Sequence, residues 1–168
     1  MNKKVLVIPI VLIFATILVV PAIAEPTKGL KVPATLLPGP QVSIPSPERT
    51  WVTNGGILQI RGDHTDFYPV TLTIGNDIYP DGTSRNFGNF IVNLKNGWLK
   101  SRGYGELTFP SVDGGFAGEI VMKMSYFTLE YSIHGVLHGF GDFEGQTLMY
   151  SYDGPIVGAL WTGYCLKG

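Results

Sequence analysis

The sequence has a single cysteine, Cys165, among its 168 residues. One cysteine allows no internal disulfide, and it excludes zinc sites that are built from several cysteines. The sequence also lacks an Asn-x-Ser/Thr acceptor for N-glycosylation. Without cross-links, the folded part of the chain has to be stabilised by its apolar core.

Charge is scarce as well. Charged residues make up 15% of the chain, with 12 Lys and Arg against 13 Asp and Glu. Loss of Lys3 and Lys4 with an N-terminal leader would leave ten basic side chains and a net charge of −3. The basic residues form no cluster in the sequence, so neither nucleic acid nor an anionic membrane surface is an expected partner.

Residues 1–24 have the pattern of a secretory signal peptide. Two lysines precede an apolar run over residues 5–20, and the segment ends in Ala22-Ile23-Ala24. We expect cleavage there, and a secreted or extracytoplasmic cell-surface location. The alternative is an uncleaved anchor, because residues 5–23 approach the ~20 apolar residues of a spanning helix. Membrane contact is expected only through this segment, if it is retained.

Residues 25–48 contain six of the twelve prolines of the chain, set among small and polar residues. This composition favours an extended linker or stalk over a packed element. The folded domain is therefore expected over residues 49–168, a length that suits one domain.

Glycine is frequent in this domain. All of the 22 glycines except Gly29 and Gly39 follow residue 48, and they recur too often for a stable helix. The periodicity is two: between residues 129 and 143 the odd positions are apolar or glycine, and the even positions include His134 and His138. This alternation predicts β-strands with the odd face buried and both histidines outside.

Short turns divide these strands. Asn96-Gly97 and Glu144-Gly145 are predicted as two-residue hairpin turns, which would pair Lys95 with Trp98 and Gly139 with Tyr150. Further turns are expected at 80–82 and 110–115. The predicted strands cover 51–61, 67–74, 84–95, 98–109, 116–126, 129–143, 146–153 and 156–166. Eight strands with short connections favour an all-β, antiparallel up-and-down barrel, and a β-sandwich is the alternative.

Four segments support a resemblance: "ERTWVTNGGILQIRG", "GGFAGEI", "HGFGDFEGQTLMYSYDGP" and "WTGY". They resemble a set of uncharacterised secreted proteins, largely archaeal, whose architecture is similar to calycin-like or allene-oxide-cyclase-like barrels. The resemblance covers most of residues 48–168. Its motifs are glycine-and-aromatic strand patterns, so it implies a barrel and an extracytoplasmic setting and assigns no active-site residue.

The alternation also predicts what faces the interior. Apolar and tyrosine side chains beside inward glycines would line a small-molecule cavity, and the alternative is an interior filled by these side chains. The predicted cavity residues are Met122, Met124, Tyr126, Tyr131, Tyr150 and Tyr152.

Outside the barrel, exposed apolar side chains predict a surface for a partner. These interface candidates are Trp98, Tyr104, Phe140 and Met149. His134 and His138 are not expected to share a metal ion, because a spacing of four on a strand separates the two Cα atoms by about 13 Å. Neither a metal nor a cofactor is predicted.

No acid, base and nucleophile converge in this pattern. The favoured function is therefore a secreted or surface-tethered, non-catalytic β-barrel that binds an apolar small molecule or a protein partner. One alternative is a structural envelope protein that forms homo-oligomers. The other is an enzyme similar to the cyclases or isomerases built on such barrels.

Overall fold

A computed structural model describes residues 29–39, 48–155 and 159–168, without the side chains of residues 63–68. The predicted signal peptide and most of the predicted linker lie outside the described residues. Within the described part, no helix is long and apolar enough to span a membrane.

The described chain forms nine β-strands in one sheet. They are β1 (Leu30–Pro38), β2 (Arg49–Val52), β3 (Ile57–Ile74), β4 (Asp77–Asn93), β5 (Trp98–Thr108), β6 (Gly114–Ser125), β7 (Glu130–Gly141), β8 (Gln146–Pro155) and β9 (Trp161–Lys167).

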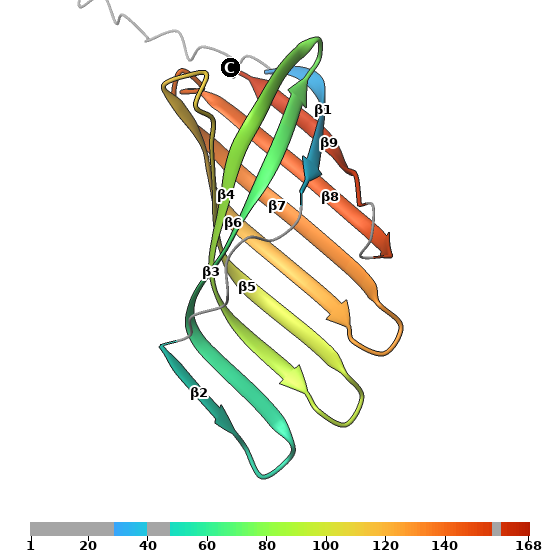
Figure 1. The fold of residues 1–168 in the computed structure, drawn as a ribbon. Coiled ribbons are helices and arrows are strands. Elements are labelled where there is room, and N and C mark those ends of the chain that lie inside the picture. Colours follow the sequence, from blue (N-terminus) through green and yellow to red (C-terminus); the bar gives the residue numbers. More distant parts are fainter. Residues whose placement is uncertain (1–28, 40–47, 156–158) are drawn as a thin grey trace, which may run out of the picture.

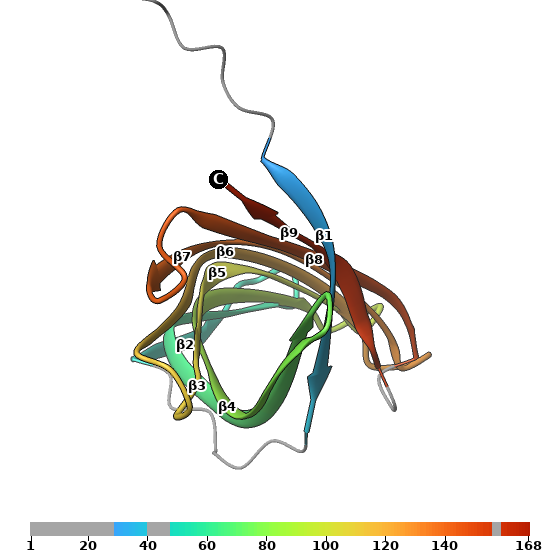
Figure 2. The ribbon, with the colours of Figure 1, turned by 90° about the horizontal axis from the view of Figure 1, so that it is seen from above.

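The sheet closes into an antiparallel barrel. Strands β3 to β9 pair with their neighbours in chain order, and β1 lies between β9 and β3 and completes a ring of eight strands. Strand β2 is additional and pairs with β3. Figure 2 shows the wall curling round until β1 meets both ends of the meander. The predicted all-β, eight-stranded antiparallel barrel is confirmed.

Closure involves only one half of the barrel. Strand β1 pairs with residues 70–74 of β3, whereas β2 pairs with residues 58–61 at the other end of the same strand. Strand β9 pairs with β8 only as far as Ser151. The upper half in Figure 1 is therefore a closed ring, and the lower half is a curved sheet running from β2 to β8.

The linker prediction is wrong for residues 30–38, which form β1. The prolines fit this strand because each lies where only one neighbour pairs with β1. Pro33 lies opposite Tyr164 of β9, before the pairing with β3 begins at Ala34. Pro38 lies opposite Val70 of β3, beyond the last β9 partner. Because no strand pairs on the other side of β1 at these two positions, the missing proline N–H leaves no hydrogen bond unmade on that side.

The turn predicted at 80–82 is also wrong. The chain reverses earlier, at Gly75 and Asn76, between the paired residues Ile74 and Asp77. Gly75 has φ of 62°, as a tight hairpin turn requires. Residues 80–82 lie within β4, where the register with β3 shifts between Val70 and Leu72. Pro80 thus lies in a β-bulge, which, like a strand position paired on one side only, tolerates proline within a sheet.

The two predicted hairpin registers are wrong, although the faces are right. Trp98 pairs with Asn93 instead of Lys95, so the register differs by two residues. Tyr150 pairs with Gly135 instead of Gly139, a difference of four. Side chains alternate with a period of two, so an even error leaves every inward residue inward.

The upper half of the barrel is filled. Phe143 packs against Phe116, Tyr79 and Phe109, with ring centroids 4.6, 5.1 and 6.0 Å away. These rings form part of a continuous core with buried side chains from β1, β3 and β5 to β9. The aromatic cluster closes this end of the interior.

Candidate functional site

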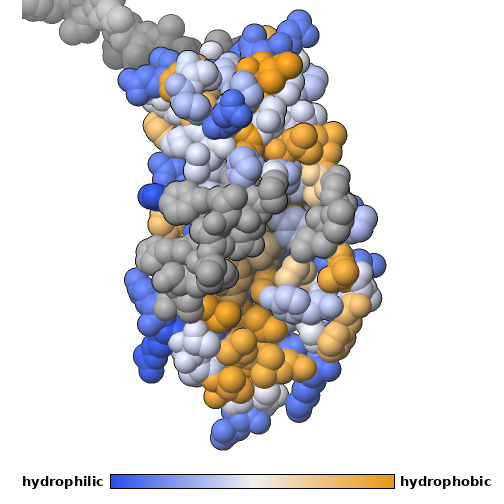
Figure 3. Space-filling view, viewed as in Figure 1, coloured by the Kyte–Doolittle hydropathy of each residue, from blue (hydrophilic) through white to orange (hydrophobic). Residues whose placement is uncertain are grey.

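The lower half of the barrel is hollow. It encloses a cavity of about 430 Å³, within the usual range for small-molecule sites. Figure 3 shows apolar side chains gathered over the lower part of the face on which the curved sheet is open. The described lining residues are Pro38, Gly39, Ile60, Asn86, Phe87, Gly88, Phe90, Leu99, Ser101, Gly103, Tyr104, Ile120, Met122, Met124, Tyr126, Tyr131, Ile133, Ala159 and Trp161.

Trp161, at the start of β9, forms the inner end of the cavity. Its ring stacks on Tyr150 of β8 with centroids 5.2 Å apart and an interplanar angle of 9°. Tyr131 of β7 packs against the same indole at 6.3 Å. Trp161 and Tyr150 are both buried. This layer separates the cavity from the filled upper core.

The side wall comes from alternate residues of β4, β5 and β6. Leu99 pairs with Met124, and Ser101 with Met122, so consecutive inward positions carry flexible or small side chains. Gly88 and Gly103 pair opposite each other on β4 and β5. A Cβ at Gly103 would collide with the backbone of Phe87, which requires glycine at this point. The pair adds no side-chain volume to the interior.

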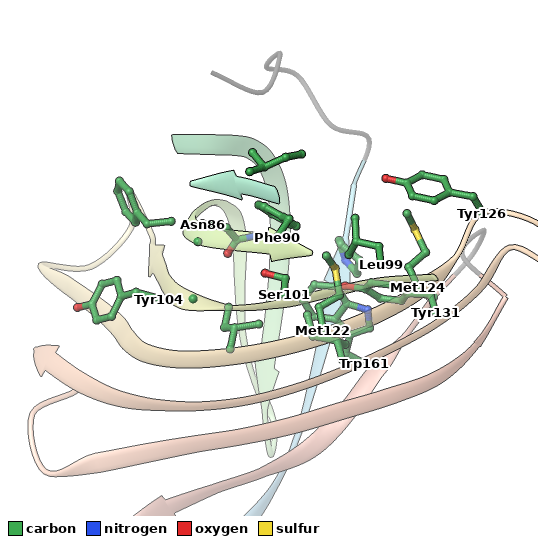
Figure 4. A pocket seen from close by; sticks show the side chains of 18 of the residues that line it. Asn86, Phe90, Leu99, Ser101, Tyr104, Met122, Met124, Tyr126, Tyr131 and Trp161 are labelled. Carbon is green, nitrogen blue, oxygen red and sulfur yellow. The ribbon is translucent and has the colours of Figure 1, made fainter. Parts of the chain in front are cut away.

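Few polar side chains face the cavity. Figure 4 shows Asn86 and Ser101 near the middle of the wall, and Tyr126 projecting at the end remote from them. The phenol of Tyr126 is partly desolvated by its surroundings, which raises its pKa. Tyr126 is half-exposed nevertheless, so this tyrosine marks the mouth of the cavity. An apolar wall with a few hydroxyl and amide groups suits an apolar guest that carries one polar group.

Four of the six predicted cavity residues line the cavity: Met122, Met124, Tyr126 and Tyr131. Tyr150 and Tyr152 are not among the described lining residues. Tyr150 points inward, as predicted, but the indole of Trp161 covers it. Tyr152 donates a hydrogen bond from its hydroxyl to the carbonyl of Pro155, 2.7 Å away.

Fifteen of the nineteen described lining residues were not predicted as cavity residues, and Trp161 is the largest of them. Alternation alone predicts whether a side chain points into or out of the barrel. It does not predict where along the barrel axis that side chain lies. The inward parity of Phe90 and Leu99 was visible in the sequence, and both line the cavity.

The four outer candidates do not form one surface. Trp98 lies at the lower end of β5 opposite Ser125, and Phe140 lies near the other end of β7 opposite Gly115. Met149 of β8 is half-buried. Tyr104 contacts Phe87 at 6.4 Å and is set apart from the labelled cluster around Trp161 in Figure 4. Of the four, Tyr104 is among the described residues that line the cavity, and Trp98 is not.

Both histidines on β7 are exposed, as predicted. The ring nitrogen Nδ1 of His138 lies 3.3 Å from the hydroxyl of Thr147, and His134 pairs opposite Ser151. Among the described side chains, no group of three His, Cys, Asp or Glu residues is close enough to hold a metal ion.

Cys165 is fully buried on β9, and its thiol donates to Oε1 of Gln146 at 3.3 Å. Burial raises the pKa of this thiol, which disfavours the nucleophilic thiolate. Cys165 does not line the cavity. The titratable groups on the described lining are tyrosine phenols.

Fold and site together define a class: an antiparallel β-barrel closed at one end, with an open apolar cavity at the other. Comparisons of the chain with protein-family models, with curated proteins and with solved structures found no match. The resemblance to calycin-like and allene-oxide-cyclase-like barrels stays a prediction.

Proposed function

We propose that this protein is a non-catalytic barrel that binds an apolar small molecule in its lower half. The observation that carries the proposal is the cavity of about 430 Å³ bounded by Met122, Met124, Leu99 and Trp161. Its signal-peptide pattern favours work outside the cytoplasm, secreted or tethered at the cell surface.

The chemistry of the wall suggests the class of ligand. Thioether side chains such as Met122 and Met124 adapt to irregular apolar shapes, and the Trp161 indole offers a flat contact. Ser101 and Asn86 supply polar contacts on one side. The expected ligand is a lipid-like or isoprenoid-like molecule with a single hydroxyl, carbonyl or carboxylic acid group.

Binding is tested with N-phenyl-1-naphthylamine, an apolar dye whose fluorescence rises in apolar surroundings. We expect saturable binding of one dye per chain, and competition by fatty acids or isoprenoid alcohols. Ser101→Phe and Met122→Trp, which place bulk in the cavity, should each weaken dye binding at least about tenfold, a change of ~1.4 kcal/mol. Quenching of tryptophan emission by the bound dye gives an independent reading close to Trp161.

The control is Ser151→Phe, which adds the same side chain at an exposed position on β8. This variant should bind the dye as the parent does. Absence of saturable dye binding in the parent, with a circular dichroism spectrum that shows a folded β protein, would contradict the proposal. Equal weakening by Ser151→Phe and Ser101→Phe would do the same, because the dye would then bind elsewhere.

A further inference from the structure

We infer that the open end of the barrel docks on an anionic lipid surface through its loops 94–97 and 126–129. This goes beyond the proposed function, because it concerns the outer rim and not the occupant of the cavity. The rim lies at the lower end in Figure 1, where β4 turns into β5 and β6 into β7.

The rim presents apolar side chains to solvent. Phe127 is 70% exposed, and Leu94, Tyr126 and Leu129 are about half-exposed. Leu160, beside the start of β9, adds another exposed apolar side chain at this end. Large apolar side chains clustered at loop tips are costly in water and mark a surface that is covered in use.

The two loops form one unit. The N–H of Tyr126 donates to the carbonyl of Gly97 over 2.9 Å, which ties loop 126–129 to loop 94–97. The ring of Phe127 covers Gly97 so closely that a Cβ there would lie 3.0 Å from it. Rigid presentation lowers the entropy lost when the rim inserts.

The backbone conformation of Leu129 is a second, independent observation that points to a functional surface at the rim. Its φ of 56° lies in the left-handed region, which a bulky side chain rarely adopts. The turn holds it there: the Leu129 N–H donates to the Ser125 carbonyl at 2.9 Å, and the Thr128 N–H donates to the Ser125 hydroxyl at 3.2 Å. Strained residues of this kind collect at functional sites, and here the strain displays a leucine to the exterior.

A basic and aromatic collar lies directly behind the rim. On the outer wall, Lys100 pairs opposite Lys123, and the ammonium of Lys123 lies 4.1 Å from the centre of the Trp98 ring. Lys95 sits in the rim loop itself and is exposed. Tryptophan and lysine just behind an apolar tip match the order of layers in a membrane, from acyl chains to headgroups.

The far end of the barrel is more acidic, although Lys31 and Lys167 lie there too. The turns there carry Asp77, Asp113, Asp142 and Glu144, with Asp81 nearby. The acidic residues nearest the rim, Glu130 and Asp153, belong to β7 and β8 and not to the β4–β6 side. The net charge of the chain hides this separation, and for that reason the sequence did not predict an anionic membrane surface as a partner. The separation of charge orients the lysines toward anionic headgroups.

The test uses the full chain and vesicles of phosphatidylcholine with or without phosphatidylglycerol. We expect vesicles with phosphatidylglycerol to bind more tightly at low salt, and the preference to weaken as salt is raised. Lys95→Glu with Lys100→Glu should reduce binding to them at least about tenfold, because the attraction of two basic residues near such a surface is lost. The matched charge control is Lys31→Glu with Lys167→Glu at the far end, which should leave binding unchanged.

Insertion is measured with a fluorophore whose emission depends on the polarity of its surroundings, attached to the cysteine of Phe127→Cys. The native Cys165 is buried, so the label should attach at residue 127. Its emission should shift to the blue on phosphatidylglycerol vesicles, whereas the same label at Ile78→Cys, at the far end, should not shift. A label at residue 127 that stays in water on bound vesicles overturns the proposal, because another part of the chain then holds the membrane. A concentration-dependent blue shift without vesicles, with dimers seen by light scattering, also overturns it and assigns the rim to a second copy.

The two proposals fail separately. The Lys95→Glu, Lys100→Glu variant should keep dye binding in the cavity, and Ser101→Phe should keep docking on vesicles. Loss of dye binding in the parent would leave the docking result standing, and loss of docking would leave the cavity result standing.

Discussion

The two halves of the barrel share their strands and differ in what fills them. In the upper half, Phe109, Phe116 and Phe143 meet on the axis. In the lower half the same strands β5 and β6 carry Ser101 and Met122 at inward positions, next to the Gly88–Gly103 pair. The alternation continues unbroken along β5 and β6 from one half to the other, so on these strands side-chain volume decides which half is filled.

Closure reinforces the difference. Strand β1 seals the half that has the aromatic core, and beyond Ser151 the lower end of β8 pairs with β7 but not with the described part of β9. Stability and binding are therefore assigned to different halves. Substitutions in one half should leave the property of the other half intact.

The largest effect is expected from Phe116→Ala in the upper half. Phe116 is fully buried, so its truncation should lower the free energy of unfolding by about 3–5 kcal/mol. Met122→Ala in the lower half should cost under about 1.5 kcal/mol, because Met122 already faces a cavity. Urea unfolding followed by circular dichroism measures both. Equal losses would mean that the two halves are packed alike.

Two neighbouring residues test the role of β1. Leu36 is 1% exposed and Leu37 is 51% exposed. Leu36→Ala should lower the free energy of unfolding by about 2–5 kcal/mol. Leu37→Ala should change it by less than about 0.5 kcal/mol. If Leu36→Ala is as mild as Leu37→Ala in urea unfolding, then β1 does not seal the barrel in solution.

An intermediate effect is expected where a glycine makes room for a ring. Gly135 pairs opposite Tyr150, and a Cβ there would collide with the Tyr150 ring. Gly135→Ala should therefore cost about 1–3 kcal/mol through overpacking. Gly55→Ala is the control, because a Cβ at Gly55 meets no atom within 4 Å. Thermal unfolding of the two variants side by side would decide, and a neutral Gly135→Ala would speak against the stacked Tyr150–Trp161 layer.

The smallest effect compares strained residues at the two ends. Leu129→Gly at the rim should raise the free energy of unfolding by up to about 1 kcal/mol, because it removes a left-handed leucine. Asp81→Gly, with φ of 58°, should gain less, since aspartate tolerates this region better. The measurement is the urea concentration at the midpoint of unfolding, compared between variants whose dependence of the unfolding free energy on urea is unchanged. A loss of stability in Leu129→Gly would show that Leu129 packs in the folded state.

Much of this arrangement was predictable from the period of two. The alternation placed Ile133, Gly135 and Leu137 inside and both histidines outside, and the structure agrees. The face assignment survived incorrect hairpin registers, because the errors were even. Sequence alone also indicated four of the residues that line the cavity.

The remainder depends on partners that are distant in the sequence. Proline-rich composition suggested a linker at 30–38, and only the pairing with β9 and β3 shows that Pro33 and Pro38 each have a neighbouring strand on one side alone. The height of Trp161 relative to Tyr150 depends on the stagger of β8 against β9. Packing also decides whether another side chain fills the space beside an inward glycine. The Tyr150 ring fills the space at Gly135, whereas Gly88 and Gly103 border the cavity.

The position of β1 between β3 and β9 also affects the order of folding. Leu30 pairs with Lys167, so the first described strand waits for the last before the ring can close. Contacts between such distant residues form late and slowly, because the intervening chain must be ordered first. Until then β3 and β8 expose unpaired edges, which makes the incompletely folded chain vulnerable to aggregation. Loss of β9 would leave the barrel permanently in that open condition.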